Sequence, residues 1–252
     1  MLSLVVTNYN KGKLLERCVK SIIDEVIADS DLELIIVDDN SNDAQSQTTY
    51  EILRKKYHNN RIKFIKNDIN RGAAATKNIG IKESKHMNIY LIDADDFVTQ
   101  DSINELKNFI KQKNSDLIFT DYIKNGSPQS LAFYFTKSGN LRKWMAVLKW
   151  KFLGASIYKR EAFESYGFFD ERNPKSDDFE LQRSWINQGC SVSYFPKKIY
   201  NWEPQTFGNQ ASQSLEERFS GYKRSAAFDK ENFYIVYITR MMLYRCKLWI
   251  RN

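Results

Sequence analysis

Short apolar runs alternate with stretches of helical periodicity through the first 120 residues, and this alternation limits the choice of fold more than any other feature of the chain. The runs typical of buried strands lie at 2–7, 32–37, 61–66, 88–92 and 116–120. The helical stretches lie at 13–28, 43–58, 73–84 and 102–113, and Asp43 is placed to cap the second of them. Alternating strands and helices predict an α/β fold with a Rossmann-like, mostly parallel central sheet and helices on both faces.

The second half of the sequence is less regular. We expect a helix at 141–153, a strand, short helix and turn within 155–171, a helix at 176–189, and short strands at 191–196 and 198–202. No linker or repeat divides the chain, so we expect one domain over 1–215, with halves at 1–100 and 101–215. Residues 216–252 are then a basic, aromatic, helical C-terminal extension.

Polar side chains follow four successive strands at the point where each strand is expected to end. They are Thr7 and Tyr9 after the first strand, Asp38 and Asp39 after the second, Arg71 and its neighbours after the third, and Asp93, Asp95 and Asp96 after the fourth. Ligands of parallel α/β sheets bind at the carboxyl ends of the strands. Polar loops alone explain the polarity of these segments, but they explain less well why aspartates recur directly at strand ends.

The stretch LIDADDF (91–97) concentrates three acids at the end of a buried strand. Neighbouring carboxylates repel one another and favour a cation. Mg²⁺ and Mn²⁺ usually bind one or two carboxylates together with the phosphates of a substrate, so one interpretation is a divalent ion that holds a diphosphate. The other interpretation is a solvated acidic turn before the helix at 102–113, because a pattern this short is common.

Two further groups of residues suit a nucleotide. The ring of Tyr9 offers a flat face for stacking, and the carboxylates after the second strand can accept an N–H group, which are the two contacts that a nucleobase needs. Arg71 and Lys77 can balance negative charge, and Gly72 permits close approach of a ligand to the backbone. Taken singly, Gly72 is better explained as a turn glycine and Lys77 as a solvated position on a helix.

The composition argues against several classes of protein. Two histidines make a histidine-based zinc site or a Ser-His-Asp triad improbable, and three separated cysteines indicate a reducing compartment. The N-terminus does not resemble a signal peptide, and no apolar run reaches the ~20 residues that cross a bilayer. The net charge of +7 asks for an acidic partner, yet no nucleic-acid-binding motif is present. The GxGxxG turn of a nicotinamide dehydrogenase is missing, and a phosphorelay receiver would account for only about half the chain.

Four segments, in this order, resemble the nucleotide-binding half of GT-A glycosyltransferases, specifically the inverting enzymes of family 2 and their bacterial surface-glycan type. The segments are SLVVTNYNKGKLLERCVKSI, LELIIVDDNSND, NDINRGAAATKNIGI and YLIDADD. The match covers residues 2–100 and extends through 167–196, which resembles the acceptor-side segment of the family. Four ordered motifs are more specific than the Asp-Ala-Asp pattern alone.

The resemblance implies roles for residues on the donor side. Thr7 and Tyr9 would line a uridine pocket. Asp39 would accept a hydrogen bond from the uracil N3–H, while Asp38 holds the loop. The remaining residues of the implied donor site are Arg71, Gly72, Asp93 and Lys77, the last standing where arginine is frequent in the family.

The resemblance also implies a metal site and a catalytic base. Asp93 would bind the ribose or assist the metal, and Asp95 would ligate the Mn²⁺ or Mg²⁺ that bridges the diphosphate. Asp96 fits a supporting role in the turn. Asp178 would take the proton from the acceptor hydroxyl, with Asp177 beside it on the acceptor side where the family usually has glutamate. A helix N-terminus with acidic first-turn residues is the other interpretation of this pair.

The activity implied is a metal-dependent inverting transfer of a sugar from a nucleotide sugar, UDP-linked before others, to a hydroxyl of a glycan or lipid-linked glycan. The alternative is a non-catalytic nucleotide-sugar-binding protein or scaffold on the same fold. Residues 232–252 hold four basic residues and no acid, as an interfacial helix on an anionic membrane does. We expect a cytoplasmic protein whose tail either contacts the inner face of the cell membrane or packs against protein.

Overall fold

The strands of this chain pair into one mixed sheet, as described by a computed structural model for residues 1–135, 156–172 and 178–203. The order across the sheet is β3-β2-β1-β4-β8-β6-β9-β5, and β7 pairs with β6. The strands are β1 (Leu2–Asn8), β2 (Leu32–Asp38), β3 (Ile62–Lys66), β4 (Asn88–Asp93), β5 (Phe97–Val98), β6 (Leu117–Lys124), β7 (Ser127–Gln129), β8 (Ser156–Lys159) and β9 (Val192–Trp202).

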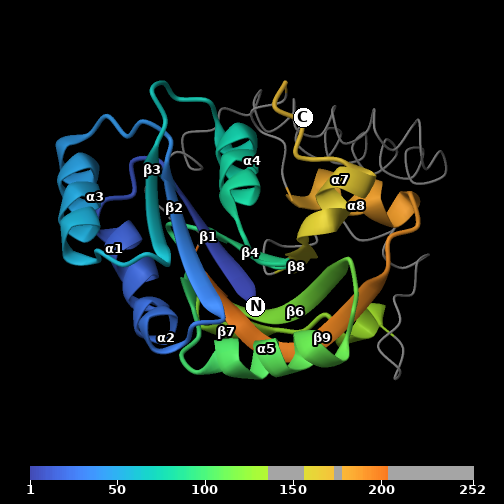
Figure 1. The fold of residues 1–252 in the computed structure, drawn as a ribbon. Helices are drawn as coiled ribbons and strands as arrows, with labels where there is room; N and C mark the ends of the chain where they lie inside the picture. The colour runs from blue at the N-terminus through green and yellow to red at the C-terminus, as the bar shows by residue number, and fades with distance from the viewer. Residues whose placement is uncertain (136–155, 173–177, 204–252) are drawn as a thin grey trace, which may run out of the picture. The chain divides into compact units, whose positions relative to one another are not determined.

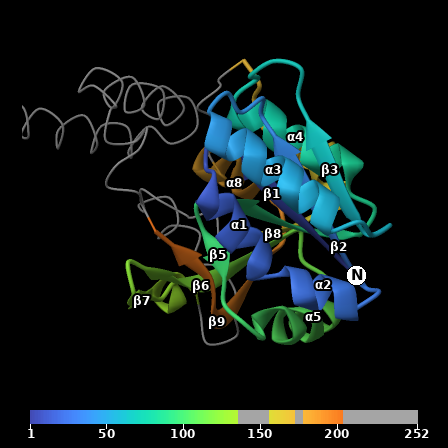
Figure 2. The ribbon, with the colours of Figure 1, turned by 90° about the vertical axis from the view of Figure 1, so that its left-hand side faces the viewer.

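Helices cover both faces of the parallel part of the sheet. They are α1 (Lys13–Lys20), α2 (Ile23–Ala28), α3 (Ala44–Lys56), α4 (Ala73–Glu83), α5 (Ser102–Gln112), α7 (Arg160–Tyr166) and α8 (Asp178–Asn187), with a 3-10 turn, η1 (Ala132–Tyr134). Figure 1 and Figure 2 show α1, α2 and α3 on one face and α4, α7 and α8 on the other. The predicted α/β fold with helices on both faces is therefore confirmed.

The first four strands form the parallel part. β1 pairs in parallel with β2 on one side and β4 on the other, and β2 pairs in parallel with β3. β1 and β2 are buried along nearly their whole length, because helices cover them on both faces. In this arrangement β1, β2 and β4 end side by side, in the register Asn8 with Asp38 and Thr7 with Asp93. The polar residues that follow these strands therefore share one edge.

The second half adds strands of both directions. β8 pairs antiparallel with β4 and with β6, while β9 runs parallel to β6 and antiparallel to β5. Because β8 is antiparallel to both β4 and β6, β6 runs in the same direction as β4, and so does β9. The carboxyl end of β9 therefore returns to the edge where the first four strands end. The short strands β5 and β7 were not expected from the sequence.

The predicted helix over 13–28 is wrong in one respect, because the structure divides it into α1 and α2. The break falls at Ser21, whose hydroxyl donates to the carbonyl of Cys18 (2.7 Å) and accepts from the backbone N–H of Val98 (3.1 Å). A serine that bonds the preceding turn competes with the helical pattern and ends the helix. The apolar residues on both sides of the break remain buried.

The two short strands expected at 191–196 and 198–202 form one strand, β9. Its register against β6 slips after Phe195, so that Asp121 of β6 faces Lys198. Pro196 lies in this irregular stretch, and proline is tolerated at such bulges because it has no N–H to donate. The proline thus marks a bulge within a strand and not the end of one.

Two expectations fall outside the described residues, namely the helix at 141–153 and the C-terminal extension. Among the residues that the structure does describe, no helix is long and apolar enough to cross a membrane.

Candidate active site

The loop after β2 is fixed by the side chain of Asp38, which is almost fully buried. One carboxylate oxygen accepts from Nδ2 of Asn8 (2.6 Å) and Oγ of Ser41 (2.6 Å), and the other accepts from the backbone N–H of Ser41 (2.9 Å). These bonds tie the end of β1 to the end of β2. Asp38 therefore shapes the loop after β2.

The carboxylate of Asp39 holds the loop after β3. It accepts from Nδ2 of Asn67 (2.8 Å) and from the backbone N–H groups of Arg71 (2.8 Å) and Gly72 (2.8 Å). Gly72 has φ 85°, a conformation in which glycine is favoured, and this allows both amides to face the carboxylate. A carboxylate has about four acceptor positions, so Asp39 retains capacity for one further donor.

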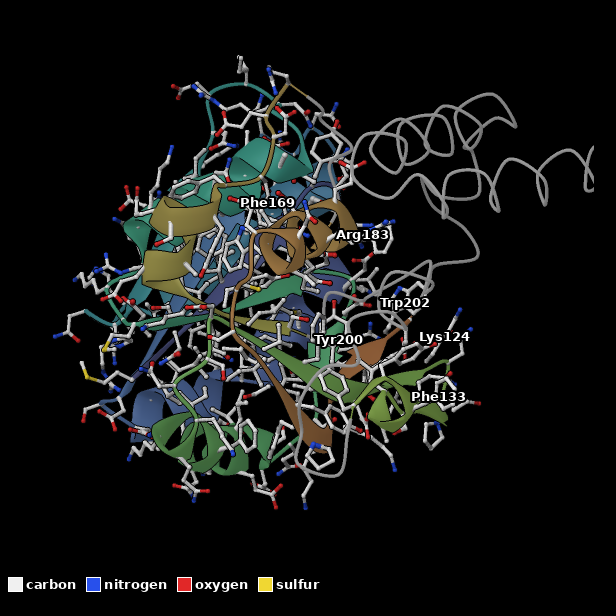
Figure 3. All side chains as sticks on the ribbon, turned by 90° about the vertical axis from the view of Figure 1, so that its right-hand side faces the viewer. Lys124, Phe133, Phe169, Arg183, Tyr200 and Trp202 are labelled. Atoms are coloured by element: carbon white, nitrogen blue, oxygen red, sulfur yellow. The ribbon has the colours of Figure 1, made fainter. Side chains whose placement is uncertain are left out.

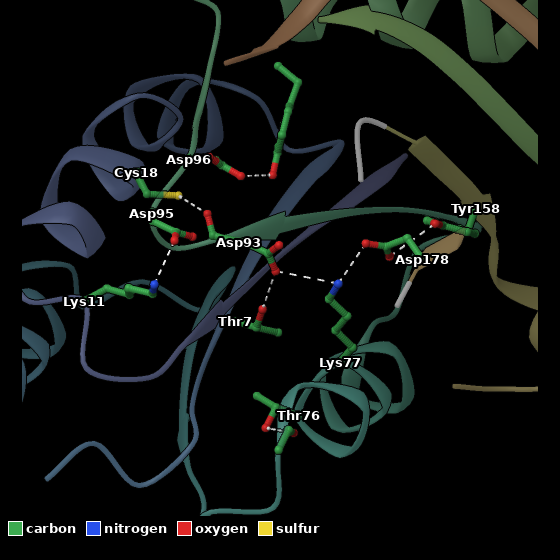
Figure 4. A network of polar contacts seen from close by, with 12 residues as sticks. Thr7, Lys11, Cys18, Thr76, Lys77, Asp93, Asp95, Asp96, Tyr158 and Asp178 are labelled. Carbon is green, nitrogen blue, oxygen red and sulfur yellow. Dashed lines mark hydrogen bonds and ion pairs between the residues drawn. The ribbon is translucent and has the colours of Figure 1, made fainter. Parts of the chain in front are cut away.

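The acidic turn begins at the last residue of β4. The backbone N–H of Ala94 donates to the carbonyl of Thr7 (3.0 Å), and that of Asp96 donates to the carbonyl of Asp93 (2.9 Å). The three carboxylates of the turn contact different partners, as Figure 4 shows. Asp93 accepts from the hydroxyl of Thr7 (3.2 Å), and Asp95 pairs with Nζ of Lys11 (2.7 Å).

Asp96 faces inward from the turn. Its carboxylate accepts from the hydroxyl of Tyr200 and from the backbone N–H of Glu203 (3.0 Å), both at the carboxyl end of β9. Burial, followed by the negative charge of Asp93, raises the pKa of Asp96 to about 7. Asp96 thus anchors the turn to β9.

Lys77 of α4 joins the two halves of the molecule. Its ammonium nitrogen lies 2.9 Å from Oδ2 of Asp178 and 3.6 Å from Oδ1 of Asp93, and the lysine side chain is only 7% exposed. The hydroxyl of Tyr158 donates to Asp178 (3.4 Å), and Nδ2 of Asn78 donates to the carbonyl of Phe169 (2.9 Å). Figure 4 shows Lys77 between the two carboxylates. The solvated helix position considered for Lys77 from the sequence is therefore excluded.

Several residues of this network were not predicted. Arg17 of α1 donates to the carbonyl of Asp95 (2.6 Å), pairs with Glu203 (2.5 Å), and lies over the ring of Phe97 (4.6 Å). Lys11 pairs with Asp95 from the loop before α1. No local spacing pattern could have identified them, because each partner lies more than 70 residues away in the chain.

The remaining predicted residues lie at the edge where the strands end, or they fall outside the residues that the structure describes. Thr7 and Tyr9 are half-buried at the end of β1, and Arg71 is exposed on the loop before α4. Asp177 lies outside the described residues, as does the basic tail at 232–252. Figure 3 shows the labelled aromatic residues Tyr200 and Trp202 on β9, which leads back toward this edge.

The acidic turn can supply part of a metal site. In the described ranges, no group of three or more histidine, cysteine, aspartate and glutamate side chains could hold a metal ion. Asp93 and Asp95, which are 46% and 22% exposed, offer two accessible oxygen donors that already face ammonium groups. Mg²⁺ commonly takes one or two carboxylates, and phosphates and water complete its shell. The residues therefore fit an ion shared with a diphosphate and do not fit a site made by protein alone.

An α/β sheet of this order, with an acidic turn after β4 and a buried carboxylate at the start of α8, has the GT-A fold of nucleotide-sugar glycosyltransferases. The family model described as glycosyl transferase family 2 matches residues 3–167, and the chain therefore belongs to this family. The resemblance inferred from the sequence is confirmed.

Two of the relatives are glycosyltransferases of bacteria. The chain is 30% identical over 157 residues to the poly(ribitol-phosphate) beta-N-acetylglucosaminyltransferase TarP of Staphylococcus aureus, a match that covers 62% of this chain and 47% of TarP. It is 27% identical to the glycosyltransferase GlyG of Streptococcus pneumoniae, over 79% of this chain and 69% of GlyG. The chain thus spans about half the length of TarP.

Solved structures agree on the fold. Crystallised S. aureus TarS 1-349 in complex with UDP-GlcNAc superimposes with a TM-score of 0.71 at 18% identity, over 90% of this chain and 65% of that one. The mannosyltransferase PcManGT of Pyrobaculum calidifontis, in complex with GDP-Man and Mn²⁺, gives a TM-score of 0.66 at 18% identity, over 88% of this chain and 64% of that one.

Proposed function

We propose that this chain transfers a sugar from a nucleotide sugar, UDP-linked before others, to a hydroxyl of a glycan or lipid-linked polymer, with inversion and with Mn²⁺ or Mg²⁺ as cofactor. Family membership supports the reaction class. The relative named for poly(ribitol-phosphate) glycosylation supports a polymeric acceptor, and the TarS complex supports a UDP-sugar donor. The PcManGT complex supports a divalent ion.

One observation carries the proposal. The oxygens of Asp93 and Asp178 lie 3.6 and 2.9 Å from the same nitrogen of Lys77. Asp93 belongs to the acidic turn that would hold the diphosphate, and Asp178 begins a helix of the second half. A sugar bound beside this lysine, next to both carboxylates, would have its leaving group on the side of Asp93 and the carboxylate of Asp178 on the other, which is the arrangement that inversion requires.

The chain's own residues then supply binding and proton transfer. The free acceptor position of Asp39 suits the uracil N3–H, and Tyr9 at the end of β1 suits the face of the base. Asp178, oriented by Lys77 and Tyr158, takes the proton from the acceptor hydroxyl as that oxygen attacks the anomeric carbon. The bond from that carbon to the diphosphate breaks, and the nucleoside diphosphate leaves. A bound divalent ion would stabilise the charge on the leaving diphosphate.

The test separates binding from transfer. UDP binding is measured by calorimetry with Mn²⁺ and with EDTA, and transfer is measured with a panel of UDP-sugars, on wild type and on Asp178→Asn. We expect Mn²⁺-dependent UDP binding in both proteins, and a loss of transfer of about 10²- to 10⁴-fold in the variant, the size typical of a lost general base. Asp170→Asn changes an exposed carboxylate of the same half, which pairs with Arg172, and serves as the control.

The other outcomes decide against parts of the proposal. Full transfer by Asp178→Asn would exclude Asp178 as the base. UDP binding without transfer of any sugar in the wild type would favour the non-catalytic binding protein. Preferential binding of another nucleoside diphosphate would leave the proposed reaction standing and would change the expected donor from a UDP-sugar to a sugar of that nucleotide.

A further inference from the structure

In the acidic turn, a lysine contacts the carboxylate oxygen that would bind the divalent ion. Nζ of Lys11 lies 2.7 Å from Oδ2 of Asp95, and the two side chains are 29% and 22% exposed. Lys11 comes from the loop between β1 and α1, and 84 residues separate it from Asp95 in the chain. An ammonium group and a divalent cation cannot both occupy the same side of one carboxylate oxygen.

The two lysines at this edge differ in their freedom to move. Lys77 is 7% exposed and lies between Asp93 and Asp178, so its displacement would leave a buried carboxylate without a counter-charge. Lys11 is four times more exposed, and its carboxylate partner stands at the rim. Breaking a partly exposed ion pair costs little, because water replaces the lost contact. Lys11 is therefore the cation that can leave.

A diphosphate would stand within reach of the displaced ammonium group. Ligand oxygens lie about 2.1 Å from Mg²⁺, so two neighbouring ligands of one ion are about 3 Å apart. A diphosphate oxygen on an ion held by Asp95 would consequently be about as far from Oδ2 as Nζ of Lys11 is now. A small rotation of the flexible lysine side chain would change its partner from carboxylate to phosphate.

We propose that Lys11 is an exchangeable cation that neutralises Asp95 in the nucleotide-free protein and moves to the donor diphosphate when the divalent ion takes Asp95. This inference rests on the proposed function and adds to it a residue that couples metal and donor. Lys11 opposes the ion when no nucleotide is present, and it assists the nucleotide once the ion is bound. Metal and nucleotide therefore each strengthen the binding of the other, since such coupling is reciprocal.

The experiment uses the full chain and two binding measurements. Free Mn²⁺ is quantified by electron paramagnetic resonance during titration without nucleotide, and UDP binding is measured by calorimetry at saturating Mn²⁺. The variants are Lys11→Met, Lys11→Arg, which keeps the charge, and Lys20→Met, which removes an exposed lysine paired with Glu16 on α1 (2.7 Å). Thermal unfolding of each variant confirms that it is folded.

Lys11→Met should change the two affinities in opposite directions. We expect Mn²⁺ alone to bind about fivefold more tightly, the effect of about 1 kcal/mol for a partly exposed ion pair, and UDP at saturating Mn²⁺ to bind about fivefold more weakly. Lys11→Arg and Lys20→Met should behave as the wild type. A purely structural role of Lys11 would weaken both affinities together.

Each other result overturns a specific statement. If Lys11→Met weakens Mn²⁺ binding, or leaves both affinities unchanged while the wild type binds UDP with Mn²⁺, the exchange is wrong and the proposed function stands. If the wild type binds no nucleoside diphosphate at any Mn²⁺ concentration, the donor site is wrong and the exchange is wrong with it.

Discussion

Gly80 of α4 lies so close to Val5 of β1 that a Cβ atom at position 80 would overlap Cγ1 of Val5, with Cγ2 of Val37 a further 3.4 Å neighbour. The helix backbone therefore packs directly on the two central strands. This contact also explains why a glycine inside the helix is acceptable despite its low helical propensity. Because α4 carries Lys77 one turn before Gly80, the close approach sets the height of Lys77 above the strand ends.

Gly80→Ala should destabilise the protein although alanine favours helices. We expect the free energy of unfolding to fall by about 1 to 3 kcal/mol, as overpacking of a filled core does. Urea unfolding followed by circular dichroism measures this change. Lys85→Ala, an exposed position just after the same helix, is the control and should change stability by no more than about 0.5 kcal/mol. Unchanged or increased stability of Gly80→Ala would contradict the packing described.

Lys77→Met should be destabilising because it leaves the carboxylate of Asp178 buried without its cation. We expect a loss of about 2 to 4 kcal/mol, somewhat below the value for a fully buried pair, since 12% of the Asp178 side chain is exposed. The double variant Lys77→Met with Asp178→Asn should regain part of this loss, because asparagine needs no counter-charge. Urea unfolding of both variants measures the interaction, with Lys82→Met on the exposed face of α4 as control. If the stability losses of Lys77→Met and Asp178→Asn simply add in the double variant, the ion pair contributes nothing to stability.

Asp43 should make the stability of α3 depend on acid pH. Its carboxylate accepts from the backbone N–H of Ser46 (2.8 Å), and the hydrogen bonds from Ser46 lower the pKa of Asp43 below its ordinary value of about 3.9. A lowered pKa stabilises the folded protein above the ordinary value, and this contribution is lost as the pH falls through the lowered one. Asp43→Asn keeps a capping side chain without the titration.

The measurement compares the unfolding free energies of wild type and Asp43→Asn from pH 6 to pH 3. The free energy of unfolding of the wild type, relative to that of Asp43→Asn, should be constant above pH 5 and should decrease below pH 4. Asp43→Ala should instead lose about 1 kcal/mol at neutral pH, because the cap itself is removed. A difference that does not vary with pH would exclude the titration.

Tyr200→Phe should loosen the acidic turn. It removes the hydroxyl that donates to the buried carboxylate of Asp96, and an unsatisfied acceptor of this kind costs about 1 to 3 kcal/mol. We expect lower stability in urea and, because the neighbouring Asp95 loses its support, weaker Mn²⁺-dependent UDP binding in calorimetry. Tyr57→Phe, after α3, is the control. If the variant is destabilised but binds UDP with normal affinity, the contact between Tyr200 and Asp96 does not support the donor site.

The elements that the sequence predicted are those determined by local pattern. The apolar run at 88–92 became β4, and Asp43 caps α3, because burial and capping act over a few neighbouring residues. The place of Asp38 and Asp39 at a sheet edge followed from parallel topology alone. In contrast, Ser21 breaks the first helix through a bond to Val98, and nothing near Ser21 in the chain signals that contact.

The contacts that complete the site are long-range and could not be derived from spacing. Lys77 and Asp178 are 101 residues apart, and they meet because α4 and α8 lie on one face of the sheet. The pairing of Lys11 with Asp95 depends on the exact path of two loops. Side chains such as these were predicted as separate candidates or were missed, since periodicity reports which face a residue occupies and not which residue it meets.

The return of β9 to the acidic turn has a consequence for synthesis of the protein on the ribosome. A nascent chain that has reached residue 100 contains every strand of the parallel part of the sheet, yet Asp96 still lacks Tyr200 and Glu203, which hold it. Chains fold from the N-terminus as they emerge, so the parallel strands can assemble before their own acidic turn is fixed. The proposed donor site is then completed late, when β9 leaves the exit tunnel.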